Sequence, residues 1–124
     1  MSHTVLIVDD SALARRDLVL RLLSMGYQVL EAENGRLALD QYLANHAIKL
    51  VISDVHMPIM NGLELCEEIK KVPDRTPPKM VIVSTETNDD MKVRGRKAGV
   101  NAWVIKPINV DRTCAVIETL LKPG

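Results

Sequence analysis

The chain has 124 residues, a length that suits one domain with a substantial core, and its acidic and basic residues balance to a formal net charge of +0. This balance gives no electrostatic argument for binding nucleic acid or an anionic membrane, and the scarcity of aromatic residues counts against a surface that stacks bases. We therefore expect no nucleic-acid binding. We also expect no membrane insertion, because no apolar run approaches the roughly 18 residues of a membrane span.

The first residues and the cysteines bear on the cellular compartment. The segment from Met1 to Val8 has no basic stretch and too short an apolar run for a signal peptide. Cys66 and Cys114 are far apart and lack the spacing of a Cys-x-x-Cys motif. The simplest interpretation is a reduced, cytoplasmic protein, and we expect it to be a monomer.

Strand-like and helix-like segments alternate from the start of the chain. Residues 4–8 form an apolar run, and Ser11 is the predicted N-cap of an amphipathic helix that ends at Gly26. Residues 27–30 are typical of a second, half-exposed strand, and a second helix begins near Leu37. The alternation of strand and helix is therefore established within the first third of the sequence.

The same alternation continues through the middle of the chain. Residues 50–53 are apolar until Ser53, as expected of a strand that is covered on both faces. Pro58 and Gly62 then predict a loop, which is followed by a helix. Residues 80–83 are typical of a fourth strand.

The last third of the chain is predicted to contain two helices and one strand. Residues 88–99 have few apolar side chains and include Gly95 within the helical pattern, so we expect this helix to be the least stable. Residues 102–105 are typical of a fifth strand, and an apolar stripe over residues 110–121 predicts a last helix.

Five strand–helix units without a repeat or a linker predict an α/β fold with one domain over residues 1–124. We expect a doubly wound, parallel, five-stranded sheet of the flavodoxin-like kind, with strand order 2-1-3-4-5. In such sheets, ligands bind beyond the carboxyl ends of the strands at the point where the order reverses. This point lies between the first and third strands.

Charged residues follow three of these strands directly. Asp9 and Asp10 come after the first strand, Asp54 ends the third, and Lys106 follows the fifth. If the strands are parallel, these side chains converge at one edge of the sheet. Carboxylates about 4 Å apart repel by on the order of 4 kcal/mol per pair at an effective dielectric of ~20, so a proton, a lysine or a cation must offset the repulsion.

The residue types at this edge favour phosphoryl chemistry. Carboxylate oxygens are the ligands that Mg²⁺ prefers, and the edge also has the hydroxyl of Ser84 and the N–H groups of helix N-termini, which bind anions. A carboxylate can accept a phosphoryl group and become an aspartyl phosphate. Asp54 is the natural acceptor because it stands alone on its strand, whereas Asp9 and Asp10 form a pair suited to the metal.

Four segments now form a recognisable set. They are Val8-Asp9-Asp10-Ser11, Ser53-Asp54-Val55-His56-Met57-Pro58-Ile59-Met60-Asn61-Gly62, Val83-Ser84-Thr85 and Val104-Ile105-Lys106-Pro107. In this order, and at the ends of these strands, they resemble the motifs of response-regulator receiver domains, the CheY-like family. The resemblance covers residues 4–121, which is essentially the whole chain.

The resemblance implies a role for each matching position. It implies that Asp54 accepts the phosphoryl group from a histidine kinase, that Asp10 binds Mg²⁺ directly, and that Asp9 assists through a metal-bound water. It also implies that the backbone carbonyl of His56 is a further metal ligand and that the side chains of Lys106 and Ser84 contact the phosphoryl group. The backbone of Val55, His56 and Thr85 is expected to bind the phosphoryl oxygens. The peptide bond between Lys106 and Pro107 is expected to be cis.

The sequence departs from the family pattern at four positions. Ser84 stands where threonine is commoner, and Asn61 replaces a frequent aspartate. Ile108 replaces a phenylalanine that often follows the Lys-Pro pair. Trp103 occupies the switch position, where a smaller aromatic residue packs inward as the hydroxyl residue moves toward the phosphoryl group. The bulk of the indole counts against such an inward movement, and the alternative is that Trp103 is simply a half-buried strand residue.

His56 and Glu86 lie close in sequence to the expected site. One hypothesis is that they gate the attacking water and so set the lifetime of the phosphoryl group. The alternative is that His56 is an ordinary surface residue of the loop.

The leading interpretation is a stand-alone signalling switch that catalyses only its own phosphorylation and dephosphorylation. We expect its phosphodonor to be a histidine kinase and its output to be a partner that binds the fourth helix, fifth strand and fifth helix. Chemotaxis is one possible pathway, and a phosphorelay intermediate acting on a histidine phosphotransfer protein, or an adaptor, is the alternative. An aspartyl-phosphate hydrolase is disfavoured because the Asp-x-Asp motif is missing, and a flavin site is disfavoured because two aspartates would repel the phosphate.

Overall fold

The computed structural model describes residues 3–86 and 88–122. Positions 1, 2, 87, 123 and 124 of the expected domain lie outside the described residues. The predicted alternation of strands and helices is confirmed. The elements, in chain order, are β1 (Thr4–Val8), α1 (Ala12–Ser24), β2 (Gln28–Ala32), α2 (Gly35–Ala44), β3 (Ile48–Asp54), α3 (Gly62–Lys70), β4 (Lys79–Ser84), α4 (Asp89–Lys97), β5 (Ala102–Ile105) and α5 (Val110–Leu121).

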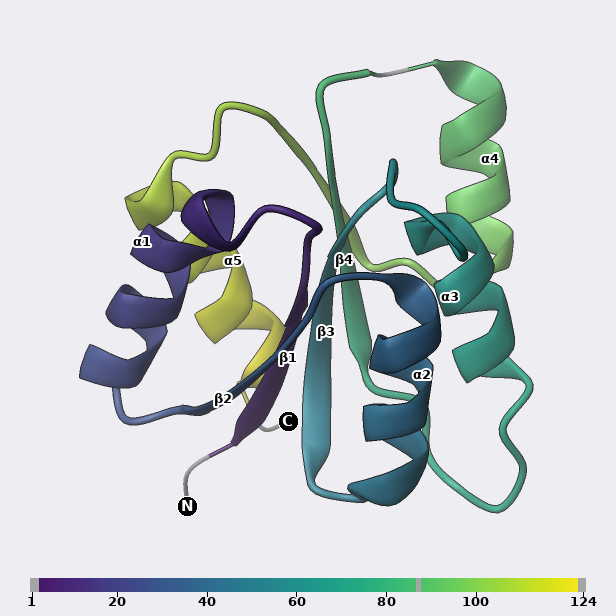
Figure 1. Ribbon diagram of the computed structural model, residues 1–124, viewed down its shortest axis with the longest axis horizontal. Coiled ribbons are helices and arrows are strands. Elements are labelled where there is room, and N and C mark those ends of the chain that lie inside the picture. Colours follow the sequence, from purple (N-terminus) through teal and green to yellow (C-terminus); the bar gives the residue numbers. More distant parts are fainter. Residues whose placement is uncertain (1–2, 87, 123–124) are drawn as a thin grey trace.

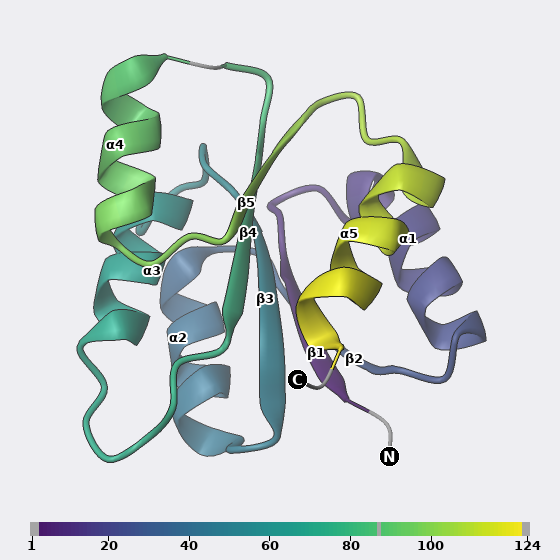
Figure 2. The same cartoon turned by 180° about the vertical axis from the view of Figure 1, so that it is seen from behind.

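The five strands form one parallel sheet in the order β2-β1-β3-β4-β5, as predicted. Helices α1 and α5 cover one face, and α2, α3 and α4 cover the other (Figures 1 and 2). The order reverses between β1 and β3, so the carboxyl ends of these two strands lie beside each other at one edge of the sheet.

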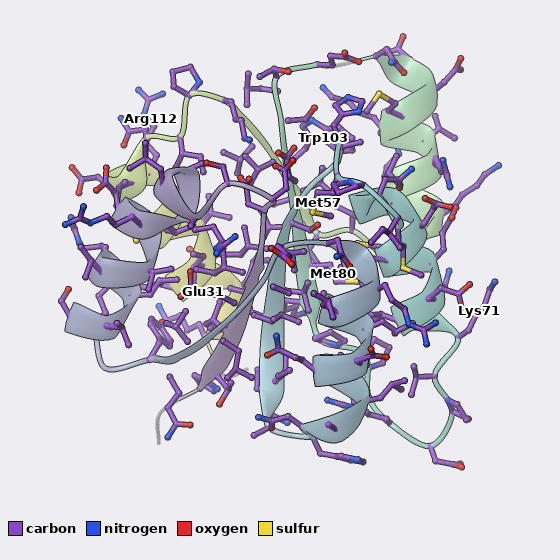
Figure 3. The ribbon with its side chains drawn as sticks, viewed as in Figure 1. Glu31, Met57, Lys71, Met80, Trp103 and Arg112 are labelled. Carbon is purple, nitrogen blue, oxygen red and sulfur yellow. The ribbon has the colours of Figure 1, made fainter. Side chains whose placement is uncertain are left out.

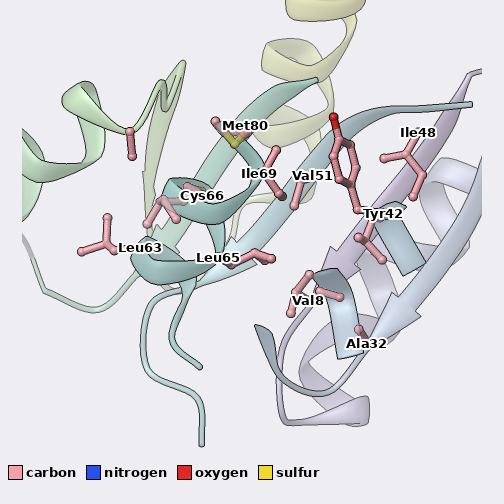
Figure 4. Packing of buried hydrophobic residues seen from close by; sticks show 14 of the residues in the cluster. Val8, Ala32, Tyr42, Ile48, Val51, Leu63, Leu65, Cys66, Ile69 and Met80 are labelled. Carbon is pink, nitrogen blue, oxygen red and sulfur yellow. The ribbon is translucent and has the colours of Figure 1, made fainter. Parts of the chain in front are cut away.

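Alternating side chains of the strands feed two hydrophobic clusters. In β1, Val5 and Ile7 pack with α1 and α5, whereas Leu6 and Val8 pack with α2 and α3. Figure 4 shows the second of these clusters, in which Tyr42 is 1% exposed. Because β1 and β3 are covered on both faces, they are buried almost throughout, and this burial holds their carboxyl ends in fixed positions.

Each helix begins with a side chain that caps its N-terminus. Ser11 accepts a hydrogen bond from the Ala14 N–H, and four asparagines do the same for the other helices, namely Asn34, Asn61, Asn88 and Asn109. Each cap contributes about 1 kcal/mol. The first helix ends as predicted, with Gly26 in the left-handed region at a φ of 93°.

Helix α4 is shorter than the predicted segment 88–99, since its regular turns run from Asp89 to Lys97. It contributes few buried side chains, but hydrogen bonds from charged side chains connect it to α3. Arg94 donates two hydrogen bonds to the carboxylate of Glu67, and the Lys70 ammonium donates to the carbonyl oxygen of Lys97. The low stability of α4 therefore stays a prediction.

Within residues 3–86 and 88–122, no helix combines the length and apolar character that a bilayer crossing requires. Both cysteines are buried, as expected for core positions. Burial raises the pKa of the Cys66 thiol to about 12, which keeps it protonated and unreactive.

Candidate functional site

The charged residues predicted to converge do converge at one edge of the sheet. Asp9 and Asp10 directly follow β1, and Asp54 is the last residue of β3. Val8 and Ser53 are paired neighbours in the two strands, so the aspartates that follow them lie side by side. This edge is the upper one in Figure 1.

The three aspartates form a compact set of oxygen donors. One carboxylate oxygen from each of Asp9, Asp10 and Asp54 lies within 4.8 Å of the others. Asp9 and Asp54 are only 7% and 9% exposed, whereas Asp10 faces solvent. Hard oxygen ligands with one open, hydrated side suit Mg²⁺, so the donor set fits that ion.

Lys106 supplies the positive charge of the site. Its Nζ lies 2.7 Å from Asp54 Oδ2 and 3.3 Å from Asp9 Oδ2, so one ammonium bridges the ends of two strands. Burial disfavours the charged form, but the hydrogen bond and the charge of Asp54, together with the charge of Asp9, outweigh it and raise the pKa of Lys106. The ammonium is therefore charged at physiological pH. The bond between Lys106 and Pro107 is cis, as the family resemblance implied.

Ser84 is fully buried at the end of β4, the strand next to β3. Its hydroxyl oxygen accepts the N–H of Glu86 at 3.0 Å, and its carbonyl oxygen accepts the N–H of Lys106 at 2.9 Å. Ser84 thus connects the loop after β4 to the lysine of the site.

The loop after β3 closes over the backbone of Asp54. Gly62 donates its N–H to the carbonyl oxygen of Val55 at 2.9 Å, and a Cβ at this glycine would collide with the carbonyl oxygen of Asp54. This close approach explains why the position requires glycine. The N–H of Val55, expected to bind phosphoryl oxygens, donates to the carbonyl oxygen of Val83 at 3.3 Å, so that role stays a prediction.

Sequence reasoning missed Arg15. This residue of α1 donates through Nη1 to the carbonyl oxygen of Asp9 and through Nε to Glu31 at 2.9 Å. Its side chain is only 12% exposed. Arg15 therefore connects α1 and β2 to the backbone of a metal-ligand candidate. Its place one turn into α1 was the only available signal, and helical spacing alone does not distinguish it from Arg16.

His56, in the loop after β3, and Glu86, which follows β4, lie close to each other. His56 Nε2 is 3.7 Å from Glu86 Oε1, and the two side chains are 60% and 58% exposed. The two residues predicted to act together are thus adjacent, and their role in controlling the attacking water stays a prediction. Thr85, whose backbone was expected to contact the phosphoryl group, lies between Ser84 and this pair.

Trp103 is half-buried, in agreement with the alternative interpretation of an ordinary strand residue. The indole packs against the cluster that includes Leu63 and Met80, and its Nε1 is buried. Figure 3 shows it between the sheet and α4. Gly95 has no side chain on this side of α4, and a Cβ there would lie 3.2 Å from the indole Cζ3. The inward movement of the indole, against which its bulk counts, stays a prediction.

Residues 5–118 match the family model described as the response regulator receiver domain. The chain belongs to this receiver domain family. The chain is 35% identical over 121 residues to a chemotaxis protein CheY homolog of Campylobacter jejuni (strain 81-176), and the alignment covers 97% of this chain and 93% of that protein. It is 33% identical over 122 residues to the chemotaxis protein CheY of Bacillus subtilis (strain 168), covering 98% and 99%.

A solved structure supports the same conclusion. The chemotaxis protein CheY4 of Vibrio cholerae superposes with a TM-score of 0.90 at 30% identity, over 98% of this chain and 100% of that one. Receiver domains take phosphoryl groups from histidine kinases and bind Mg²⁺ at an acidic pocket, so this chain is a signalling domain of the two-component type. In this chain, Asp9, Asp10 and Asp54 form an acidic cluster at the carboxyl edge of the sheet.

Proposed function

We propose that Asp54 accepts a phosphoryl group from a phosphohistidine and that the protein is a switch controlled by this modification. The observation that carries the proposal is the carboxylate of Asp54 at the order reversal, 2.7 Å from the Lys106 ammonium and within reach of two further carboxylates. This combination has no structural purpose, because the repulsion among the carboxylates opposes folding.

The proposed step is a displacement at phosphorus. An oxygen of Asp54 forms a bond to phosphorus as the bond from phosphorus to the donor's imidazole nitrogen breaks, and that nitrogen keeps the electron pair. The Lys106 ammonium stabilises the negative charge on the transferred group, and Ser84 would donate its hydroxyl proton to a phosphoryl oxygen while its oxygen still accepts the N–H of Glu86. The chain itself catalyses nothing beyond its own phosphorylation and the later hydrolysis.

Asp9, Asp10 and Asp54 would hold Mg²⁺, with the carbonyl oxygen of His56 as a further ligand. The ion, when bound, neutralises the charge that builds up between the carboxylates and the incoming phosphoryl oxygens. The Arg15 contact keeps the Asp9 backbone in place, and Lys106 keeps the Asp54 carboxylate oriented.

The output is proposed to be a protein that binds the surface formed by α4, β5 and α5. Lys106 and Ser84 connect the site to this surface, since the Lys106 N–H bonds the Ser84 carbonyl and β5 leads directly to Lys106. Relatives named as chemotaxis proteins support a chemotaxis pathway, and family membership favours a switch over a hydrolase. We expect a cytoplasmic protein that acts as a monomer.

Acetyl phosphate with Mg²⁺ tests the proposed acceptor. The wild type is expected to gain the mass of one phosphoryl group, and Asp54→Asn, which keeps the size of the side chain, is expected to gain none. Asp17→Asn, a change on the nearby helix α1, is the matched control and should be labelled like the wild type. Equal labelling of Asp54→Asn would reject the proposal.

A separate experiment tests the proposed role of His56 and Glu86. If they control access of the attacking water, replacing both with alanine should change the rate at which phosphorylated protein loses its phosphoryl group, with phosphorylation itself retained. The hypothesis is motivated by the 3.7 Å separation of His56 Nε2 and Glu86 Oε1 and by their places two residues after Asp54 and Ser84. An unchanged decay rate in the double variant rules it out.

A further inference from the structure

We propose that Gly95 is a positioning residue for Trp103: by lacking a side chain, it creates the space that allows the indole to lie inward between the sheet and α4. The sole tryptophan of the chain and the glycine come from neighbouring elements, β5 and α4. Figure 3 shows Trp103 on the α4 side of the sheet.

The space around Gly95 is tight on one side only. A Cβ at this position would lie 3.2 Å from Trp103 Cζ3, which is tighter than nine in ten real Cβ contacts, so the ring would have to shift. Its other neighbours, Leu63 Cδ2 and Val100 Cγ2, would both lie at an ordinary 3.6 Å. The indole is therefore the group that a side chain at residue 95 would displace.

Within residues 3–86 and 88–122, no other feature requires glycine at this position. Gly26 and Gly99 have positive φ values, of 93° and 89°, but Gly95 does not. It lies in the interior of α4, where glycine is a poor helix former relative to alanine. A residue that weakens its own helix and has ordinary backbone geometry is explained by the space it leaves.

In its inward position, the indole lacks a hydrogen bond. Trp103 Nε1 is buried and has no hydrogen-bond partner among the residues that the structure describes. A buried donor without a partner costs free energy, so packing favours the inward position while the N–H opposes it. These two contributions have opposite sign, so they partly offset each other in the free-energy difference between two positions of the ring.

An alternative position is available on the outer side. A groove of about 180 Å³ runs between α4 and β5, and Trp103 forms part of its wall together with Lys92, Arg96, Val100, Asn101 and Ala102. A ring turned into this groove would expose its N–H to water. Gly95 thus sets the balance between an inward indole and an indole on the proposed output surface.

The emission of the single indole tests this in the protein without Mg²⁺ or phosphoryl donor. Gly95→Ala is expected to shift the emission of Trp103 to the red and to increase its quenching by acrylamide. Lys97→Ala, a change on the same helix outside the groove lining, is the matched control and should leave both unchanged. If Gly95→Ala has the emission and quenching of the wild type, the inference is wrong.

A second background separates positioning from a general effect on folding. With Trp103→Phe the benzo ring is absent, so Gly95→Ala should raise the melting temperature through better helix propensity, whereas in the Trp103 background it should not. A Gly95→Ala protein that fails to fold, but folds in the Trp103→Phe background, supports the inference. The same change in melting temperature in both backgrounds contradicts it. Because no step involves phosphorylation, these results stand whether or not Asp54 is the acceptor.

Discussion

Replacing Lys106 with methionine removes the one cation that faces the carboxylates of Asp9 and Asp54 in the described structure. Methionine keeps the length of the side chain but not its charge. The two carboxylates are largely buried and would then face each other and Asp10 without compensation. We expect a large loss of stability at neutral pH in the absence of divalent metal.

The magnitude follows from the two distances. At an effective dielectric of ~20, the pair at 2.7 Å attracts by about 6 kcal/mol and the pair at 3.3 Å by about 5 kcal/mol. Desolvation of the ammonium and the carboxylates offsets most of this, and the Lys106 side chain is still 23% exposed. We expect a net loss of about 2–4 kcal/mol in the free energy of unfolding, which lowers the melting temperature by roughly 10 °C.

Thermal and urea unfolding, followed by circular dichroism, measure this loss. Lys79→Met is the matched control, because Lys79 is an exposed lysine at the opposite end of β4 and should lose little stability. The pKa of Lys106 is raised in the folded state, so its contribution is present at neutral pH and disappears as the pH rises through that raised pKa. A Lys106→Met protein as stable as the Lys79→Met control at pH 7 would refute the account of the site.

Three further predictions concern the loop, the α3–α4 contact and the metal. Gly62→Ala should lower the free energy of unfolding by about 3 kcal/mol or more and slow phosphorylation, because the added Cβ would collide with the Asp54 carbonyl oxygen. Urea unfolding measures the loss of stability, and labelling by acetyl phosphate measures the rate of phosphorylation. An unchanged labelling rate would contradict this prediction. Glu67→Gln should cost no more than about 1 kcal/mol, since its partly exposed pair with Arg94 is screened. The Arg94 hydrogen bond lowers the pKa of Glu67, so the stability difference between the wild type and Glu67→Gln should vanish as the pH falls through the lowered pKa. A difference between their melting temperatures that is as large in acid as at neutral pH would contradict this prediction. Mg²⁺ at about 100 times its dissociation constant should stabilise the wild type by about 2.7 kcal/mol, and Asp10→Asn much less, as measured by thermal unfolding.

Much of the fold was predictable from local patterns. The apolar run before Asp54 marks a strand buried on both faces, and Ser11 and Gly26 mark the two ends of the first helix. Polar residues at the ends of such strands predicted the site, because parallel strands place their carboxyl ends at one edge. These inferences depend only on periodicity and chain direction.

Contacts that depend on packing between elements were not predictable. The bond from Arg15 to the Asp9 backbone depends on how α1 lies on the sheet, and the Glu67–Arg94 pair depends on the placement of α4 against α3. Trp103 shows the same limit, since nothing in the sequence indicated that Gly95 lies opposite the indole ring. Side-chain volume predicts packing only when the opposing residue is known.

The central claim is that Asp54 accepts the phosphoryl group. The most direct measurement is mass spectrometry of tryptic peptides after incubation with acetyl phosphate and Mg²⁺, with borohydride reduction to mark any acyl phosphate. The account predicts one modified residue, Asp54, and no modification when Mg²⁺ is removed by a chelator. Modification at Asp9, Asp10 or a residue outside the acidic cluster, with Asp54 unmodified, would contradict it.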